Sequence, residues 1–491
     1  MLFNSWQYLV FLPLVAVVYF LLPHRVRWGW LLLASYYFYM SWNASLVVLI
    51  GGTTLISWGA GLLMQREAEK RRRRLWLALA AVVSLGVLFF FKYFNFFSTS
   101  LTGILGVFGL PVSPLTLNLM LPVGISFYTF QTLGYVIDVY RGDLPAERHL
   151  GIYALFVSFF PQLVAGPIER ATNLLPQFRV KHTPDPARMA WGLRYICWGL
   201  LKKVVIADGA AVLVNDVYND LGSYTPMTWL VATLLFAVQI FCDFSGYTDI
   251  ARGSACILGF DLMENFKAPY LARSVREFWR RWHISLSTWF MDYLYIPLGG
   301  SRVGRPRHLL NLFLTFLLSG LWHGAEWNFV LWGVYHGALM VIDTLLQPAV
   351  KRLDGRLRAK PARAVWVGAQ VLFTFGLVCF GWLLFRANSL GDIATILRGL
   401  PSAFRHPILH LQQTYGQLFM GSDVLWRMLV GVAMLLGFDL VLKNRGDPFS
   451  LLARQKAPLR VAVSYLVAFA LLAGVLTMPE HVAVEFIYFQ F

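Results

Sequence analysis

A histidine and a carboxylate lie inside an otherwise apolar segment of this chain, residues 309–331. They are His323 and Glu326, in the run WHGAEWN at 322–328. A charged group at mid-membrane depth costs about 2.5–3.5 kcal/mol, so ionisable residues there usually face a cavity, a pathway or a reaction. If the segment is helical, a spacing of three residues puts both on one face. A neutral imidazole can remove a proton from a hydroxyl at physiological pH, so His323 is the candidate base. Trp322 and Asn328 are candidates for supporting the site around His323.

A second histidine, His283, lies in the run FWRRWHIS at 278–285. Taken alone, it fits a hydrogen-bonded structural role as well as a catalytic one. Asp292 and Glu326 are candidates for polarising or positioning a histidine, because each lies near one in the sequence. Asp243 and Asp249 interrupt a long apolar segment, where pairing of helices through hydrogen bonds and contact with a substrate are both open.

Basic side chains gather around His283. They are Lys267, Arg276, Arg280 and Arg281. Attraction to anionic lipid explains such a cluster, and so does a docking site for a polyanionic cofactor. Both interpretations stay open on spacing alone.

The chain ends on the aromatic run FIYFQF at 486–491, which contains Tyr488. On its own, this run predicts an aromatic anchor at the outer membrane interface.

These residues must be positioned by membrane-spanning helices. The chain of 491 residues is 58% hydrophobic and 14% charged, whereas soluble domains carry about 25% charge. Apolar runs of about 20 residues predict spans. They lie at 6–22, 28–43, 44–64, 75–97, 119–140, 150–166, 189–215, 227–260, 309–327, 328–347, 365–386, 424–442 and 461–478. We therefore expect an all-α, polytopic transmembrane protein with about 11–13 membrane segments, re-entrant ones among them, around a central cavity, in one domain over 1–491.

The distribution of Lys and Arg orients these spans. Loops 66–74, 351–363 and 443–460 are basic and are predicted to be cytoplasmic, which places the N-terminus and the tail 479–491 outside. This loop bias explains the net charge of +17 without nucleic acid. The four cysteines are scattered through apolar segments, so buried core positions are expected rather than a disulfide or a metal site.

Taken together, these motifs resemble the membrane-bound O-acyltransferase family, and within it the bacterial alginate O-acetyltransferase-like branch. The resemblance runs over nearly the whole chain. It rests on MLFNS (1–5), LPVGISFY (121–128), FPQLVAGP (160–167), DFSGYTD (243–249), ENFK (264–267), RRWHIS (280–285), WHG (322–324) and FIYFQF (486–491).

The resemblance implies an enzyme of the bacterial inner membrane that takes an acetyl group from a cytoplasmic thioester, acetyl-CoA, for O-acetylation of an exported, alginate-like polysaccharide. It implies that His323 is catalytic, that His283 is a second functional position and that Tyr488 accepts the acyl group. A periplasmic acetyltransferase protein is the implied partner, and the polysaccharide is reached indirectly.

Other functions stay open at this stage. A D-alanyl or peptidoglycan O-acyl transferase would share the family. A transporter or flippase component would also use intramembrane histidines and broken spans. A scaffold for a glycan synthase would tolerate replacement of His323.

Overall fold

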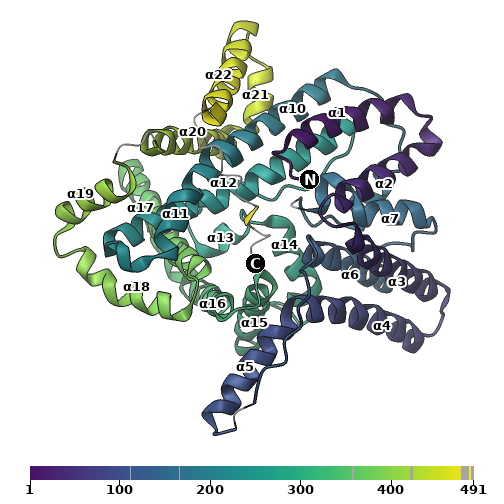
Figure 1. The fold of residues 1–491 in the computed structure, drawn as a ribbon, viewed down its shortest axis with the longest axis horizontal. Helices are drawn as coiled ribbons and strands as arrows, with labels where there is room; N and C mark the ends of the chain where they lie inside the picture. Colours follow the sequence, from purple (N-terminus) through teal and green to yellow (C-terminus); the bar gives the residue numbers. More distant parts are fainter. Residues whose placement is uncertain (111, 165, 357–358, 421–423, 477–485, 488–491) are drawn as a thin grey trace. The chain divides into compact units, whose positions relative to one another are not determined.

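The structure is a computed structural model that describes residues 1–476, 486 and 487, apart from 111, 165, 357–358 and 421–423. All regular secondary structure in this part of the chain is helical (Figure 1). Six of the described helical stretches, at 44–66, 70–107, 226–258, 327–356, 360–386 and 425–445, are long and apolar enough to cross a membrane. Shorter apolar helices cover 6–21, 150–163 and 457–471. The prediction of an all-α polytopic membrane protein is therefore confirmed.

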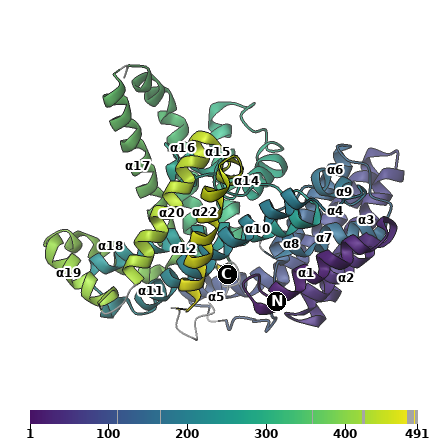
Figure 2. The same cartoon turned by 90° about the horizontal axis from the view of Figure 1, so that it is seen from above.

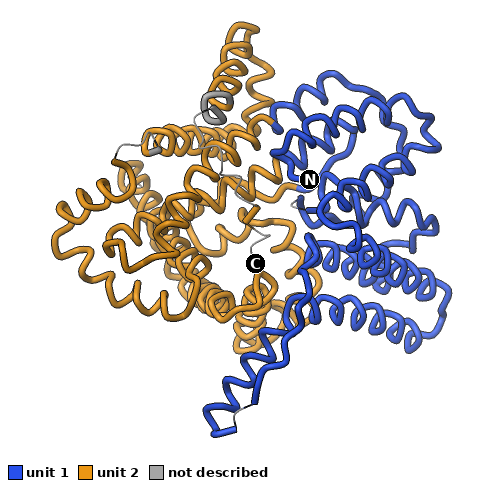
Figure 3. The backbone as a smooth tube through the Cα atoms, viewed as in Figure 1, with its two compact units in different colours: residues 1–196, 250–263 blue, residues 197–249, 264–491 orange. Residues whose placement is uncertain are grey.

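The chain divides into two compact units (Figure 3). The first comprises Met1–Ile196 and Ile250–Met263. Its helices are α1 (Trp6–Leu21), α2 (His24–Met40), α3 (Val47–Arg66), α4 (Lys70–Leu88), α5 (Phe94–Val107), α6 (Ile125–Arg141), α7 (Leu150–Ser158), α8 (Phe160–Leu163) and α9 (Ala171–Gln177). Helix α3 packs against α4, α6 and α7, and α2 packs against α7.

The second unit comprises Cys197–Asp249 and Glu264–Phe491 and holds both candidate histidines. Helices α10 (Pro186–Leu200) and α12 (Pro226–Leu258) contribute residues to both units. The other helices of this unit are α11 (Asp208–Asn219), α13 (Val275–Trp279), α14 (Ile284–Phe290), α15 (Arg305–His323), α16 (Trp327–Arg356), α17 (Lys360–Arg386), α18 (Leu390–Ala403), α19 (Pro407–Leu418), α20 (Val424–Arg445), α21 (Pro448–Ala453) and α22 (Ala457–Leu476).

Helices α15 and α16 pack closely as a hairpin in the second unit, and small residues allow this approach. A β-carbon added to Gly320 would meet the carbonyl oxygen of Phe329 at 2.4 Å and the Cα of Gly333 at 2.9 Å. Because these are backbone atoms, the two helices can approach this closely only while both positions lack a side chain. This contact fixes the end of α15, where His323 lies.

The polar insertion after α17 forms two helices, α18 and α19, which lie together in both views (Figure 2). They pack on the beginning of α12. The hydroxyl groups of Thr414 and Thr228 are 3.0 Å apart, and the Trp229 ring occupies the space above Gly399.

Some boundaries differ from the sequence-based expectation. The span predicted to end at residue 97 continues through a π-helical turn, Phe89–Tyr93, into α5, so the loop expected from residue 98 begins after Val107. The segment after His283 is helical over α14 and the π-turn Met291–Tyr295, both far shorter than the ~20 residues that a crossing requires. Cys197 is exposed on α10, whereas the other three cysteines are buried as expected.

Candidate active site

His323 is the last residue of α15 and is only 4% exposed. Its ring centre lies 5.0 Å from that of Trp332 on α16 and 5.5 Å from that of Phe385 on α17. Both neighbouring rings meet the imidazole nearly edge-on. Three helices therefore enclose the candidate base in an aromatic cage that keeps bulk water away from it.

The structure brings His283 and His323 to the same tryptophan. The ring centre of Trp322 lies 5.0 Å from that of His323 and 6.0 Å from that of His283. The ring centre of His283 also lies 4.7 Å from that of Phe244. His283 is fully buried, in a backbone conformation with φ 44° and ψ 55° that a non-glycine residue adopts at a cost of about 1–3 kcal/mol.

Asn265 holds this strained turn. Its backbone carbonyl accepts a hydrogen bond from the N–H of Ile284 at 3.0 Å, and its side-chain oxygen accepts one from the Ser285 hydroxyl at 2.6 Å. The ENFK and RRWHIS motifs are thus parts of one local structure.

The spacing of three residues predicts that Glu326 and His323 share one helical face, and this prediction is wrong. Helix α15 ends at His323, because Gly324 adopts extended backbone there, and the Phe329 ring fills the space that a side chain at position 324 would need. Glu326 lies in the exposed turn before α16.

Two residues of the C-terminal run are buried in the second unit. Phe486 is 0% exposed and Ile487 is 2% exposed. The backbone N–H of Ile487 donates a hydrogen bond of 2.7 Å to the carboxylate of Asp243. Tyr488, the predicted acyl acceptor, lies outside the described residues.

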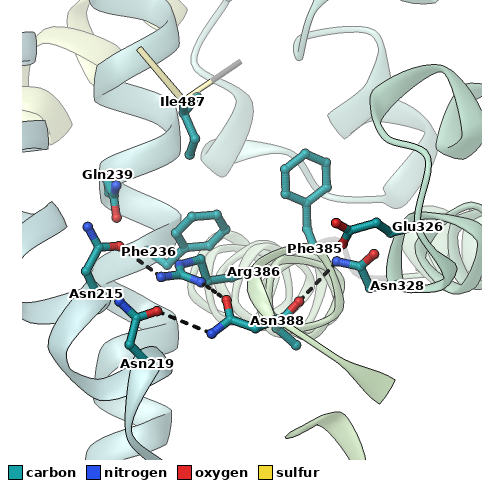
Figure 4. Close-up of a pocket in the computed structure, with 11 residues that line it drawn as sticks. Asn215, Asn219, Phe236, Gln239, Glu326, Asn328, Phe385, Arg386, Asn388 and Ile487 are labelled. Carbon is teal, nitrogen blue, oxygen red and sulfur yellow. Dashed lines mark hydrogen bonds between the residues drawn. The ribbon is translucent and has the colours of Figure 1, made fainter. Parts of the chain in front are cut away.

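Ile487 lines a polar cavity of about 400 Å³ together with residues that adjoin His323 (Figure 4). The cavity wall includes Glu326, Asn328 and Phe385, and Phe385 is the same ring that contacts His323. The rest of the wall is rich in amide side chains: Asn215, Asn219, Gln239 and Asn388.

A network of hydrogen bonds orders this polar wall. The Arg386 guanidinium donates to Asn388 at 2.7 Å and to Asn215 at 2.9 Å, and Figure 4 shows it between the two amides. The Asn328 amide donates to the Ala387 carbonyl at 3.0 Å. The wall therefore offers fixed donors and acceptors rather than mobile side chains.

A second cavity, of about 370 Å³, is mainly apolar and lies beside α14 and α15. Arg276 and Arg280 line it, and so does Ser319. Ser319 precedes His323 by four residues on α15, so the two side chains share a helical face. This cavity therefore approaches His323 from one turn away.

Residues 147–385 match the family described as MBOAT, membrane-bound O-acyltransferase family. A probable alginate O-acetylase of Azotobacter vinelandii is 44% identical over 398 residues, which are 80% of this chain and 76% of the relative. The corresponding protein of Pseudomonas putida is 42% identical, over 79% of this chain and 78% of its own. A peptidoglycan O-acetyltransferase of Helicobacter pylori is 34% identical, over 84% of this chain and 82% of its own.

This chain belongs to the membrane-bound O-acyltransferase family. It is an enzyme, an O-acyltransferase, and a multi-pass membrane protein. The family resemblance drawn from its motifs is confirmed.

The other predicted site residues of this O-acyltransferase do not gather around His323. The Arg276 guanidinium already donates a hydrogen bond of 3.2 Å to the Asp343 carboxylate. Arg281 forms an ion pair with Glu277 at 2.6 Å within the same turn, and the side chain of Lys267 is exposed. Asp292 lies half-buried in the π-turn Met291–Tyr295.

Sequence reasoning missed two groups of residues in this enzyme. One is the amide wall, whose members come from α11, α12 and the turn after α17, so no local pattern marks them. The other is Lys203, which forms ion pairs with Asp243 at 2.6 Å and Asp208 at 2.8 Å. Two adjacent lysines inside an apolar helix, at 202 and 203, were the signal that could have found it.

Proposed function

We propose that this O-acyltransferase takes an acetyl group from acetyl-CoA at the cytoplasmic face of the inner membrane and transfers it to Tyr488. A periplasmic acetyltransferase protein then passes the group to an exported polysaccharide. The names of the relatives, an alginate O-acetylase and a peptidoglycan O-acetyltransferase, support a polysaccharide as the final acceptor. The observation that carries the proposal is that buried Ile487 lines a cavity whose wall also includes Phe385, a ring in contact with His323.

The chemistry is an acyl transfer with one general base. His323 removes the phenolic proton of Tyr488, and the oxygen attacks the thioester carbonyl. The new C–O bond forms as the C–S bond breaks, and the imidazolium returns its proton to the departing thiolate of coenzyme A. A phenol has an ordinary pKa near 10, so this base is needed at neutral pH.

The two cavities support separate routes for donor and acceptor. The apolar cavity, with Arg276 and Arg280 in its wall, suits a donor that carries phosphates behind an acyl thioester. Its volume falls in the range of about 300–1,000 Å³ that is usual for small-molecule sites. The polar cavity suits the emerging acyl-tyrosine, because its amides can hold an ester carbonyl and a hydroxylated acceptor.

Charge counting supports the direction of transfer. The basic segments around Arg276 and Arg302 predict a cytoplasmic face for the donor cavity. Counting spans from the basic cytoplasmic loops places the turn after α17, and with it Asn388, on the external side of the membrane.

The test is the intact mass of the purified protein after incubation with isotope-labelled acetyl-CoA, for the wild type, His323→Ala and Tyr488→Phe. We expect one acetyl group on the wild type, mapped to Tyr488, and none on either variant. Labelling of Tyr488→Phe at the wild-type level would exclude the tyrosine as acceptor. Binding of acetyl-CoA without any label on the wild type would instead favour direct transfer to a separate acceptor.

A further inference from the structure

The segment where α10 passes into α11 carries a π-helical turn, Leu201–Ala207, that presses against α12. A β-carbon on Gly246 of α12 would meet the Gly199 carbonyl oxygen at 2.8 Å. This close approach and the π-turn present two consecutive lysines to α12, which a regular α-helix does not do because successive side chains diverge by about 100°.

The first lysine contacts two side chains of α12. Lys202 Nζ lies 2.5 Å from Asp249 Oδ2 and donates to the Ser245 hydroxyl at 2.9 Å. All three side chains are buried and belong to the π-turn or to α12. These contacts join the π-turn to α12.

The second lysine forms part of a group that extends to the C-terminal run. Lys203 Nζ contacts Asp243 Oδ1 at 2.6 Å and Asp208 Oδ1 at 2.8 Å, and all three residues are at most 3% exposed. Two carboxylates face one ammonium here. The other oxygen of Asp243, Oδ2, accepts the N–H of Ile487, 244 residues later in the chain.

Burying a carboxylate is costly unless hydrogen-bond donors surround it. The Ile487 N–H supplies one of these donors, so the C-terminal run completes the coordination of Asp243. The neighbouring side chain adds apolar contact, since the Phe486 ring lies 4.4 Å from Tyr247 and 5.8 Å from Phe244. Phe244 and Tyr247 follow Asp243 on α12 by one and four positions.

We propose that Asp243, held by Lys203, anchors the C-terminal run and is a positioning residue for acyl transfer. The anchor acts through one peptide bond, because Ile487 immediately precedes Tyr488 and adjacent Cα atoms are about 3.8 Å apart. This role in transfer rests on the proposed function, whereas the anchoring itself does not.

Asp243→Asn and Asp249→Asn form a matched pair for the test. Each removes one buried carboxylate of α12 from a lysine of the π-turn. Among the described residues of the C-terminal run, Ile487 donates its N–H to Asp243. The full-length variants are compared in detergent micelles by hydrogen–deuterium exchange of the C-terminal peptide. We expect exchange about tenfold faster or more in Asp243→Asn, as for loss of a charged hydrogen bond, and wild-type exchange in Asp249→Asn.

A second pair of variants covers the case in which Asp243→Asn fails to fold. Ile487→Pro removes the donor N–H and leaves the ion pairs intact, whereas Ile487→Val keeps the N–H. Faster exchange in the proline variant alone supports the anchor. Unchanged exchange in folded Asp243→Asn and Ile487→Pro overturns it, and so does equal acceleration in Asp249→Asn.

Labelling with acetyl-CoA separates the anchor from the relay. We expect Asp243→Asn to lower the rate of Tyr488 acetylation at saturating donor by about tenfold or more, with the KM for acetyl-CoA unchanged. Wild-type labelling kinetics in this variant would overturn the positioning role. A wild type that takes no label, but shows the expected exchange pattern, would refute the relay and leave the anchor supported.

Discussion

The ring of His283 lies 6.0 Å from the indole of Trp322. Trp322 precedes His323 in the chain and contacts its ring as well. The two histidine motifs of this enzyme, 40 positions apart in the printed sequence, therefore share one aromatic side chain. Trp322 is 3% exposed, so its replacement should alter the packing around both histidines.

Two replacements of Trp322 separate the effect of its ring packing from that of its indole N–H. We expect Trp322→Phe to retain acetyl transfer within a few-fold, because a ring still fills the space between the histidines. Trp322→Ala leaves a cavity, and such changes cost about 3–5 kcal/mol. Initial rates of Tyr488 labelling and thermal midpoints of both variants are the measurement. Equal loss of rate in Phe and Ala would show that the indole N–H is what matters.

The proposed general-base role predicts that His323 differs from other buried histidines. His323→Ala is expected to lower the labelling rate by about 10²–10⁴-fold while acetyl-CoA still binds. His336 is a matched control, since it is 1% exposed in the same aromatic cluster and contacts Trp279 and Trp332. His336→Gln should label at close to the wild-type rate. Similar losses of labelling rate in His323→Ala and His336→Gln would indicate that both histidines only stabilise the folded aromatic cluster.

The exposed arginine of the donor cavity should affect binding more than chemistry. Arg280 lines the cavity and is solvent-exposed. We expect Arg280→Ala to raise the KM for acetyl-CoA several-fold, with little change in kcat, because phosphate contacts are made before and during the reaction alike. The effect should shrink at high salt. Arg305→Ala, at the beginning of α15, is the control, and an equal rise in KM there would point to general surface charge.

Gly320 tests the contact between α15 and α16. Gly320→Ala would force its methyl group against the carbonyl oxygen of Phe329 and the Cα of Gly333, so we expect a loss of about 1–3 kcal/mol in the free energy of unfolding. Gly376→Ala on α17 meets no atom within 4 Å and should be neutral or stabilising by up to about 1 kcal/mol. Thermal midpoints in detergent measure both. No difference between the two variants would contradict the close approach.

Stability should depend on pH through Glu169 in the first unit. Burial raises the pKa of its carboxyl from 4.5 to about 7, against the opposing effect of hydrogen bonds from Met263 N–H and the Asn173 amide. Between these values the folded chain binds more protons than the unfolded chain. The free energy of unfolding therefore falls as pH rises from about 4.5 to about 7.

Thermal midpoints across this pH range check the Glu169 prediction. Glu169→Gln should flatten the slope, because the side chain no longer titrates. Glu69→Gln removes a largely exposed carboxylate and should leave the slope as in the wild type. A slope that persists in Glu169→Gln would assign the effect to another group.

Sequence reasoning found the helices and the two histidine motifs because both depend on local patterns. Apolar runs predict spans because backbone groups inside a membrane must be hydrogen-bonded within the segment. Each of the thirteen predicted segments overlaps at least one described helix. The end of α15 at His323 was not predicted, because the Phe329 ring, five residues beyond Gly324, decides it. The contact between Phe385 and His323 and that between Ile487 and Asp243 join distant segments, which periodicity does not reveal.

The contact between Ile487 and Asp243 joins two parts of one polypeptide. Docking of the C-terminal run is therefore unimolecular and independent of protein concentration. A tethered segment of this kind competes for its site at an effective concentration of about millimolar when its linker is short. An inhibitor that binds at Asp243, where Ile487 docks, must displace this built-in competitor, so its potency against the full-length enzyme will be weaker than its intrinsic affinity for that site.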